Sequence, residues 1–173
     1  MNTMSDYTRG KIAVGLAVGG IVFLVGIPFI LAEIALFIDE KLDLPSLTES
    51  NFISIPLIVL GLLLVAWAAF AQIKTGRGTP VPAIPTQKLV VTGPYKLCRN
   101  PMLLGTVIYY LGVSFWINSL SSIALTALFL VCSIAYIKIV EEKELEARFG
   151  EEYREYKRKT PFLIPRFKKR KKR

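Results

Sequence analysis

The sequence contains no histidine, only two cysteines, and fewer acidic than basic residues. Without histidine, imidazole general bases, histidine metal clusters and Ser-His-Asp triads are all excluded. Cys98 falls in a basic loop and Cys132 in an apolar segment, so the two imply no disulfide framework. Arg99 beside Cys98 could lower the pKa of this thiol, but a catalytic cysteine is not expected because no partner base is visible.

Apolar residues, by contrast, are abundant. They make up 53% of the 173 residues, and the mean hydropathy is +0.47. These values favour an integral membrane protein over a soluble domain. The net charge of +9 is concentrated in part in the tail at 166–173, where seven of eight residues are basic. In a membrane protein such a tail is typical of contact with an anionic membrane surface or of simple solvation, and less so of nucleic-acid binding.

Four apolar runs predict an all-α protein with four membrane-spanning helices, at about residues 12–36, 52–73, 101–117 and 120–140. Pro28 predicts a kink in the first helix, and Gly15 with Gly19 forms a small-residue pair that permits close helix contact. Only Asn118 and Ser119 separate the last two runs. This short connection predicts a tight helical hairpin.

The charges of the connecting segments predict the orientation in the membrane. Residues 39–50 read as an acidic loop with four acids, whereas 74–99 carries five basic residues and no acid. The positive-inside rule therefore places the loop at 74–99 and both chain ends in the cytoplasm. An even number of spans agrees with this placement.

Beyond Val140 the composition becomes highly charged. Leu145, Phe149, Tyr153 and Tyr156 are spaced so that they would share one face of a helix. We expect the fourth helix to leave the membrane, to bend at Gly150 and to continue along the membrane surface. Prolines at 161 and 165 would end it. A solvated amphipathic tail is the simpler interpretation.

The stretch TGPYKLCRNPMLLG, residues 92–105, lies at the start of the third apolar run. Asn100 is predicted to be an N-cap whose side chain accepts backbone donors, and Pro101 the first helical residue. With Lys96 and Arg99 nearby, the positive end of this helix could bind an anion such as a carboxylate. The alternative is a basic loop that only caps a membrane helix on its cytoplasmic side.

The hairpin would place Glu141 and Glu142, at the end of the fourth run, beside this stretch. Carboxylates so near lipid are costly unless they are paired. Pairing with Arg99 or Lys138 is the structural explanation. The functional explanation is a pocket for a zwitterionic or cationic cofactor that carries an adenosine.

The ordered pattern GPY-x₃-RNP-x₂-G, a short hairpin, EE-x₂-L, FGEEYREY and P-x₃-P resembles the isoprenylcysteine carboxyl methyltransferase and phospholipid methyltransferase superfamily. The resemblance covers residues 74–165, and the loop GRGTPVP at 76–82 is similar to the prokaryotic branch. It implies one membrane domain over 1–173, S-adenosylmethionine as cofactor, and cofactor-binding regions at 74–105 and 137–165.

Carried over residue by residue, the resemblance implies catalytic roles for Arg99, Asn100 and Glu141. It implies cofactor binding by Gln87, Lys88, Leu89, Val90, Tyr95, Arg99, Asn100, Pro101, Met102, Leu103, Glu141 and Glu142. Glu141 would take the ammonium group or the ribose hydroxyls. Arg99 would bind the cofactor carboxylate or order Glu141, and Tyr95 would stack on the adenine or face the sulfonium.

Three positions depart from the family pattern. Asn100 replaces a histidine found in many members, and Leu103 stands where tyrosine is usual. Ile137 stands where the eukaryotic prenylcysteine enzymes have an arginine associated with the substrate carboxylate, and the neighbouring Lys138 points about 100° around the helix. A prenylcysteine substrate is therefore not expected.

The expected function is methyl transfer from S-adenosylmethionine to a small lipophilic or amphiphilic acceptor with a carboxylate, thiol or amine. The expected partners are the lipid bilayer and this acceptor, with no metal and no nucleic acid. The cytoplasmic membrane of a prokaryote is the expected location, with the endoplasmic reticulum as the alternative. An NADPH-dependent lipid reductase of related fold and a non-enzymatic membrane scaffold are the competing hypotheses.

Overall fold

The computed structural model describes residues 10, 14, 15, 17–47, 51–76 and 86–165, and all regular structure in these residues is helical. The sequence features at 1–9, 77–85 and 166–173, which include most of the GRGTPVP loop and the basic tail, lie outside the described residues. In chain order the elements are a π-turn η1 (Val22–Gly26), α2 (Ile27–Leu42), α3 (Asn51–Ala71), a π-turn η2 (Gln72–Gly76), a 3₁₀ turn η3 (Gly93–Lys96), α4 (Pro101–Trp116), α5 (Leu120–Tyr136), a π-turn η4 (Ile137–Glu141), α6 (Glu142–Phe149) and α7 (Glu151–Lys159).

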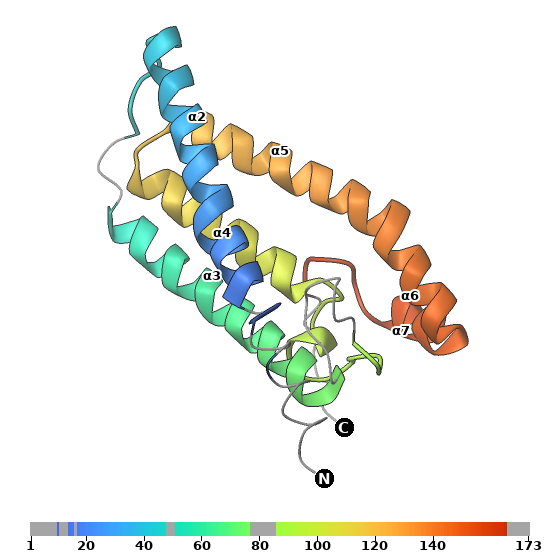
Figure 1. Ribbon diagram of the computed structural model, residues 1–173. Helices are drawn as coiled ribbons and strands as arrows, with labels where there is room; N and C mark the ends of the chain where they lie inside the picture. Colours follow the sequence, from blue (N-terminus) through green and yellow to red (C-terminus); the bar gives the residue numbers. More distant parts are fainter. Residues whose placement is uncertain (1–9, 11–13, 16, 48–50, 77–85, 166–173) are drawn as a thin grey trace, which may run out of the picture.

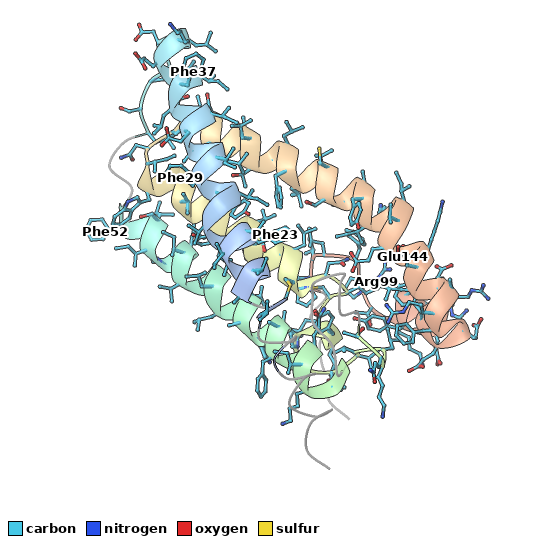
Figure 2. All side chains as sticks on the ribbon, in the orientation of Figure 1. Phe23, Phe29, Phe37, Phe52, Arg99 and Glu144 are labelled. Carbon is cyan, nitrogen blue, oxygen red and sulfur yellow. The ribbon has the colours of Figure 1, made fainter. Side chains whose placement is uncertain are left out.

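Three of the described helical stretches are long and apolar enough to cross a membrane. They are Ala17–Leu42 with 26 residues, Phe52–Gly76 with 25 and Leu120–Phe149 with 30. Large apolar side chains on their surfaces are exposed, among them Phe23, Phe29, Phe37 and Phe52 (Figure 2). Without water around them, helices of this kind satisfy their backbone groups internally and leave their apolar side chains to lipid.

Helix α4 is shorter, with 16 residues, or roughly 24 Å at 1.5 Å per residue. It lies against α3 along its length, while α2 packs mainly against α5 and also contacts α4 (Figure 1). A Cβ atom added at Gly61 of α3 would lie 2.5 Å from the backbone nitrogen of Tyr109, and one added at Gly105 would lie 2.9 Å from the carbonyl oxygen of Gly61. The closest helix contact is therefore between α3 and α4 and depends on glycines that the sequence analysis did not single out.

The predicted irregularity at Pro28 is present as the π-turn η1 directly before α2. Proline has no N–H, so it frees carbonyls one turn earlier. The freed carbonyls find partners on α4, because the hydroxyl of Tyr109 donates to the Leu24 oxygen at 2.8 Å and that of Tyr110 to the Phe23 oxygen at 2.6 Å. Two tyrosines thus join the first helix to α4 inside an apolar environment.

Removing these hydroxyls is expected to destabilise the helix assembly. Tyr109→Phe and Tyr110→Phe each leave a carbonyl without its donor, at a cost of about 0.5–1.5 kcal/mol per site. Thermal unfolding in detergent measures the loss. Tyr136→Phe is the matched control, because Tyr136 is exposed on α5, and its unfolding temperature should stay at the wild-type value. Equal stability of all three variants would contradict the proposed role of the two hydrogen bonds.

Helix α2 extends further than expected, to Leu42. The prediction that Asp39 belongs to a loop is therefore wrong. Its carboxylate accepts hydrogen bonds from the Ser119 hydroxyl at 2.5 Å and the Ser121 N–H at 3.1 Å. These donors belong to the first turn of α5 and its N-cap. The extra helical turn is stabilised because it brings an acid to a helix N-terminus.

Helices α4 and α5 are joined by the turn at 117–119 and diverge from it (Figure 1). Near the turn, the Ser114 hydroxyl bonds to that of Ser122 at 2.8 Å and lies 3.4 Å from that of Thr126. All three hydroxyls are buried, so hydrogen bonds as well as apolar packing hold the two helices together at this end.

The helical stretch that begins at Leu120 continues past Val140 to Phe149, and the predicted bend at Gly150 is confirmed, with φ +56° at this residue. The prediction that Leu145, Phe149, Tyr153 and Tyr156 share one helix face is wrong. Gly150 ends α6 and starts α7 in a new direction, so the two tyrosines follow a separate helix axis. The last helix ends at Lys159, before the first of the two prolines.

Candidate functional site

The structure confirms that Asn100 is the N-cap of α4 and that Pro101 is its first residue. The side chain of Asn100 does not cap the helix, contrary to the prediction. Its Nδ2 instead donates to the carbonyl oxygen of Phe162 at 3.0 Å, and its backbone N–H donates to the same oxygen at 3.2 Å. The backbone N–H of Arg99 donates to Pro161 at 2.8 Å. The segment after α7 therefore returns to the start of α4, where its carbonyl oxygens accept hydrogen bonds from the residues that precede the helix.

A compact ion-pair cluster, formed by Arg99, Glu142, Glu146 and Lys157, lies beside this N-terminus. Nη1 of Arg99 pairs with Oε1 of Glu142, and Nζ of Lys157 lies 2.7 Å from Oε2 of Glu142 and 2.9 Å from Oε1 of Glu146. The side chains of Arg99 and Glu142 are only 11% and 8% exposed. Two positive and two negative charges thus balance within the cluster, as burial of charge requires. Arg99 lies between α4 and the bend of α6 and α7 (Figure 2).

The partner of Arg99 is Glu142, whereas Glu141 is exposed and forms no ion pair with any residue in the described part of the chain. The π-turn η4 explains this choice, because it inserts one extra residue just before Glu142. Glu142 then takes the angular position that Glu141 would hold on an uninterrupted α-helix. The other predicted partner, Lys138, lies instead over the ring of Phe162, with Nζ 5.3 Å from the ring centre.

The guanidinium of Arg99 keeps one group without a partner. Its carbon lies 5.5 Å from the centre of the Phe162 ring. Its Nε is nevertheless buried with no hydrogen-bond partner in the described structure. A buried, unpaired N–H donor of a charged group favours an anionic or carbonyl ligand at this position.

Tyr95 lies in the hydrophobic core together with Ala68, Ala71 and Val90. Its hydroxyl accepts a hydrogen bond from Nε2 of Gln72 at 2.6 Å. Its carbonyl oxygen accepts one from the hydroxyl of Tyr156 at 2.7 Å. Burial raises the pKa of the Tyr95 phenol, so the group is neutral. Through these contacts Tyr95 holds α3, α7 and the loop before α4 in place relative to one another.

The other predicted cofactor-binding residues fall into two groups. The backbone N–H groups of Gln87 and Lys88 donate to the carbonyl oxygen of Gly76 at 2.7 and 3.3 Å, while their side chains are exposed. Leu89 is half-buried between these two residues and the buried Val90. Met102 and Leu103, in the first turn of α4, are also half-buried.

Gln72 and Lys157 were missed by the sequence analysis, and Tyr156 was noted there only as part of a predicted helix face. Gln72 looks like the polar end of an apolar span, and Lys157 is one of several lysines in a charged tail. No local signal distinguishes them, because their contacts join segments far apart in the chain.

The lowered pKa that Arg99 could give the Cys98 thiol is not found, in keeping with the expectation that Cys98 is not a catalytic cysteine. Cys98 is buried, and this burial raises the pKa of its thiol, which the hydrogen bond from Asn100 offsets only in part. The thiol therefore stays protonated at neutral pH, as for a structural cysteine. Among the described residues there is also no group of three or more Cys, Asp or Glu side chains arranged to hold a metal ion.

Comparison with known proteins gives three curated relatives. Methanethiol S-methyltransferase 2 of Bradyrhizobium diazoefficiens is 37% identical over 78 residues, which is 42% of this chain and 27% of that protein. A cobalt-zinc-cadmium resistance protein of Cupriavidus metallidurans is 29% identical over 118 residues, 68% of this chain and 53% of that protein. A nickel-cobalt-cadmium resistance protein of Alcaligenes xylosoxydans is 27% identical over 119 residues, 68% of this chain and 54% of that protein. The chain thus spans between about a quarter and about half of the length of these relatives.

The family match covers the site. A family described as phospholipid methyltransferase matches residues 50–152, which is more than half of the chain. The matched region contains α3, α4, α5 and α6, and with them Arg99, Glu141 and Glu142. The ordered motifs, the apolar helices and this match agree, and the chain belongs to the phospholipid methyltransferase family of membrane proteins.

Proposed function

We propose that this protein is an S-adenosylmethionine-dependent methyltransferase that acts on a small lipophilic or amphiphilic acceptor. The observation that carries the proposal is the pairing of Arg99 with Glu142 beside the N-terminus of α4, which leaves the neighbouring Glu141 exposed and unpaired among the described residues. A carboxylate with no internal partner, next to a neutralised ion-pair cluster, is free to bind a cationic group. Membership of the family supports methyl transfer as the reaction.

The residues at this end of α4 fit the polar groups of S-adenosylmethionine. Glu141 would take the ammonium group or the ribose hydroxyls. The unpaired Nε of Arg99 and the first N–H groups of α4, which the Asn100 side chain does not cap, would face the carboxylate. Gln87, Lys88 and Leu89, with Met102 and Leu103, would surround the adenosine as the family pattern implies. Val90 and Tyr95 would act by holding the loop in place.

The bound cofactor supplies a methyl group activated on a sulfonium. The new bond forms between the acceptor atom and the methyl carbon while the sulfur–carbon bond breaks, and the electron pair stays on sulfur. The chain therefore has to align the acceptor with the methyl group and exclude water. With no histidine in the chain, the acceptor is expected to be a carboxylate, thiolate or neutral amine. The match to a methanethiol S-methyltransferase favours a thiol, which would lose its proton to water and react as the thiolate.

We also propose four membrane spans, with α4 as the third and the turn at 117–119 as the far end of a hairpin. The structure shows α4 to be largely buried against its neighbours, which suits a span shorter than the bilayer core. The basic loop before α4 and the basic C-terminal region favour a cytoplasmic site. The cofactor would then enter from the cytoplasm and the acceptor from the bilayer of a prokaryotic cytoplasmic membrane.

Methyl transfer tests the proposed reaction and its acceptor. Purified protein in detergent is incubated with S-adenosylmethionine labelled in the methyl group and with hexanethiol, hexanoate or hexylamine, which differ only in the head group. The expected result is labelled product with the thiol, reduced at least tenfold in Glu141→Gln and unchanged in Glu152→Gln, whose acid is exposed on α7. Labelled product with hexanoate or hexylamine alone would show that the acceptor is a carboxylate or an amine and not a thiol. No label with any acceptor, together with saturable NADPH binding, would support the reductase hypothesis instead.

A further inference from the structure

A second candidate site lies at the end of the second membrane span, and neither Arg99 nor Glu142 lines it. It is a hollow of about 260 Å³ between the last turns of α3, the π-turn η2 and the start of η3. We propose that this hollow binds the phosphate of an anionic phospholipid. The proposal does not depend on the methyltransferase function, because none of the hollow's residues belongs to the ion-pair cluster.

The walls of the hollow combine two kinds of surface. The polar part consists of Lys74, Thr75 and Thr92, and the two threonine hydroxyls lie 3.3 Å apart. The apolar part consists of Trp67 and Phe70, which are 47% and 60% exposed on the outer surface of α3. Exposed aromatic rings followed by a lysine one or two turns later are typical of a helix at the boundary between hydrocarbon and headgroups.

Gly93 shapes the hollow between these two parts. It adopts φ +61°, and a Cβ atom at this position would lie 3.4 Å from the indole nitrogen of Trp67. The indole N–H therefore lies at the wall formed by Gly93. An N–H donor, two hydroxyls and an ammonium group are the groups that bind phosphate oxygens in proteins.

The charge of the hollow selects an anion. Among the described residues no acidic side chain lines it, and Lys74 forms no ion pair with any of them. Its Nζ lies 5.7 Å from the centre of the Phe70 ring, which keeps the ammonium group over the aromatic wall. The adjoining apolar surface is open to the surroundings of the span and would contact the glycerol and acyl part of a lipid. A free phosphate would leave that surface unused, so the combination favours a phospholipid.

Native mass spectrometry of the purified full-length protein tests the proposal with four probes. They are phosphatidylglycerol, phosphatidylcholine, diacylglycerol without phosphate, and inorganic phosphate. We expect phosphatidylglycerol to be retained most strongly, phosphatidylcholine more weakly, and diacylglycerol at least tenfold more weakly than phosphatidylglycerol. Lys74→Gln should reduce phosphatidylglycerol retention at least fivefold.

The chain offers a matched control in Lys41 of α2. Its Nζ also lies 5.7 Å from a phenylalanine ring, that of Phe37, but acidic residues flank it. Lys41→Gln should therefore leave phosphatidylglycerol retention unchanged.

Equal losses in Lys41→Gln and Lys74→Gln, or equal retention of diacylglycerol and phosphatidylglycerol, would overturn the proposal. Saturable binding of inorganic phosphate that displaces the lipid would identify the ligand as a free anion and would overturn it as well. The proposed reaction is tested with other probes, labelled S-adenosylmethionine and a thiol, so a failure of phosphatidylglycerol binding here leaves it standing.

Discussion

Replacing Glu142 by alanine is expected to destabilise the protein by about 3–5 kcal/mol, the usual cost of removing one partner from a buried ion pair. The buried Arg99 would be left without a countercharge, whereas Lys157 would lose one of its two carboxylate partners and keep Glu146. Because Lys157 lies on α7 and Arg99 before α4, the loss should also loosen the segment after Gly150. Urea or thermal unfolding in detergent measures the change.

The matched control for this substitution is Glu152→Ala, on the exposed side of α7. It removes the same charge from the same region and should leave the unfolding curve close to that of wild type. A Glu142→Ala variant as stable as Glu152→Ala would show that the ion pair with Arg99 does not form in the membrane protein. It would then remove the structural basis for assigning the free carboxylate to Glu141.

Gly61→Ala is expected to have an effect of similar size, about 3 kcal/mol or more, through overpacking of α3 against α4. The added carbon would meet the Tyr109 nitrogen at 2.5 Å and the Gly105 oxygen at 2.7 Å. Both are backbone atoms, so no side chain can move aside to make room. The two helices would have to separate, which would also displace Arg99 at the start of α4. Unfolding in detergent and the fraction of monodisperse protein are the measurements.

Gly20→Ala is the control, because a Cβ atom at Gly20 would have no neighbour within 4 Å. The same substitution there should be neutral, or stabilising by up to about 1 kcal/mol through helix propensity. If Gly61→Ala were as well tolerated as Gly20→Ala, the close approach of α3 and α4 would be wrong.

Features with a local cause could be predicted from the sequence. The start of α4 at Asn100 and Pro101 follows from the fixed φ of proline, and the bend at Gly150 follows from the freedom of glycine to adopt positive φ. The apolar runs predicted where the long helices lie, because a membrane-spanning helix needs a continuous apolar stretch.

The choice between Glu141 and Glu142 could not be predicted in the same way. It depends on the π-turn at Ile137–Glu141, which shifts the helix by one residue. Nothing in the residue types of this turn marks it, since a π-turn is stabilised by the contacts that it makes possible. The role of Asn100 was missed for a related reason. Its side chain donates to the carbonyl oxygen of Phe162, which lies 62 residues further along the chain and after α7.

The central claim is that Glu141 binds S-adenosylmethionine while Glu142 holds Arg99 in place. Titration of S-adenosylmethionine by calorimetry in detergent, into wild type, Glu141→Gln and Glu152→Gln, tests it most directly. The predicted result is saturable binding by wild type and Glu152→Gln, weakened about tenfold or more in Glu141→Gln, which corresponds to about 1.4 kcal/mol. Unfolding of Glu141→Gln should match wild type, so that the loss reflects binding. Equal affinity in all three proteins, or no binding by the wild type, would contradict the claim.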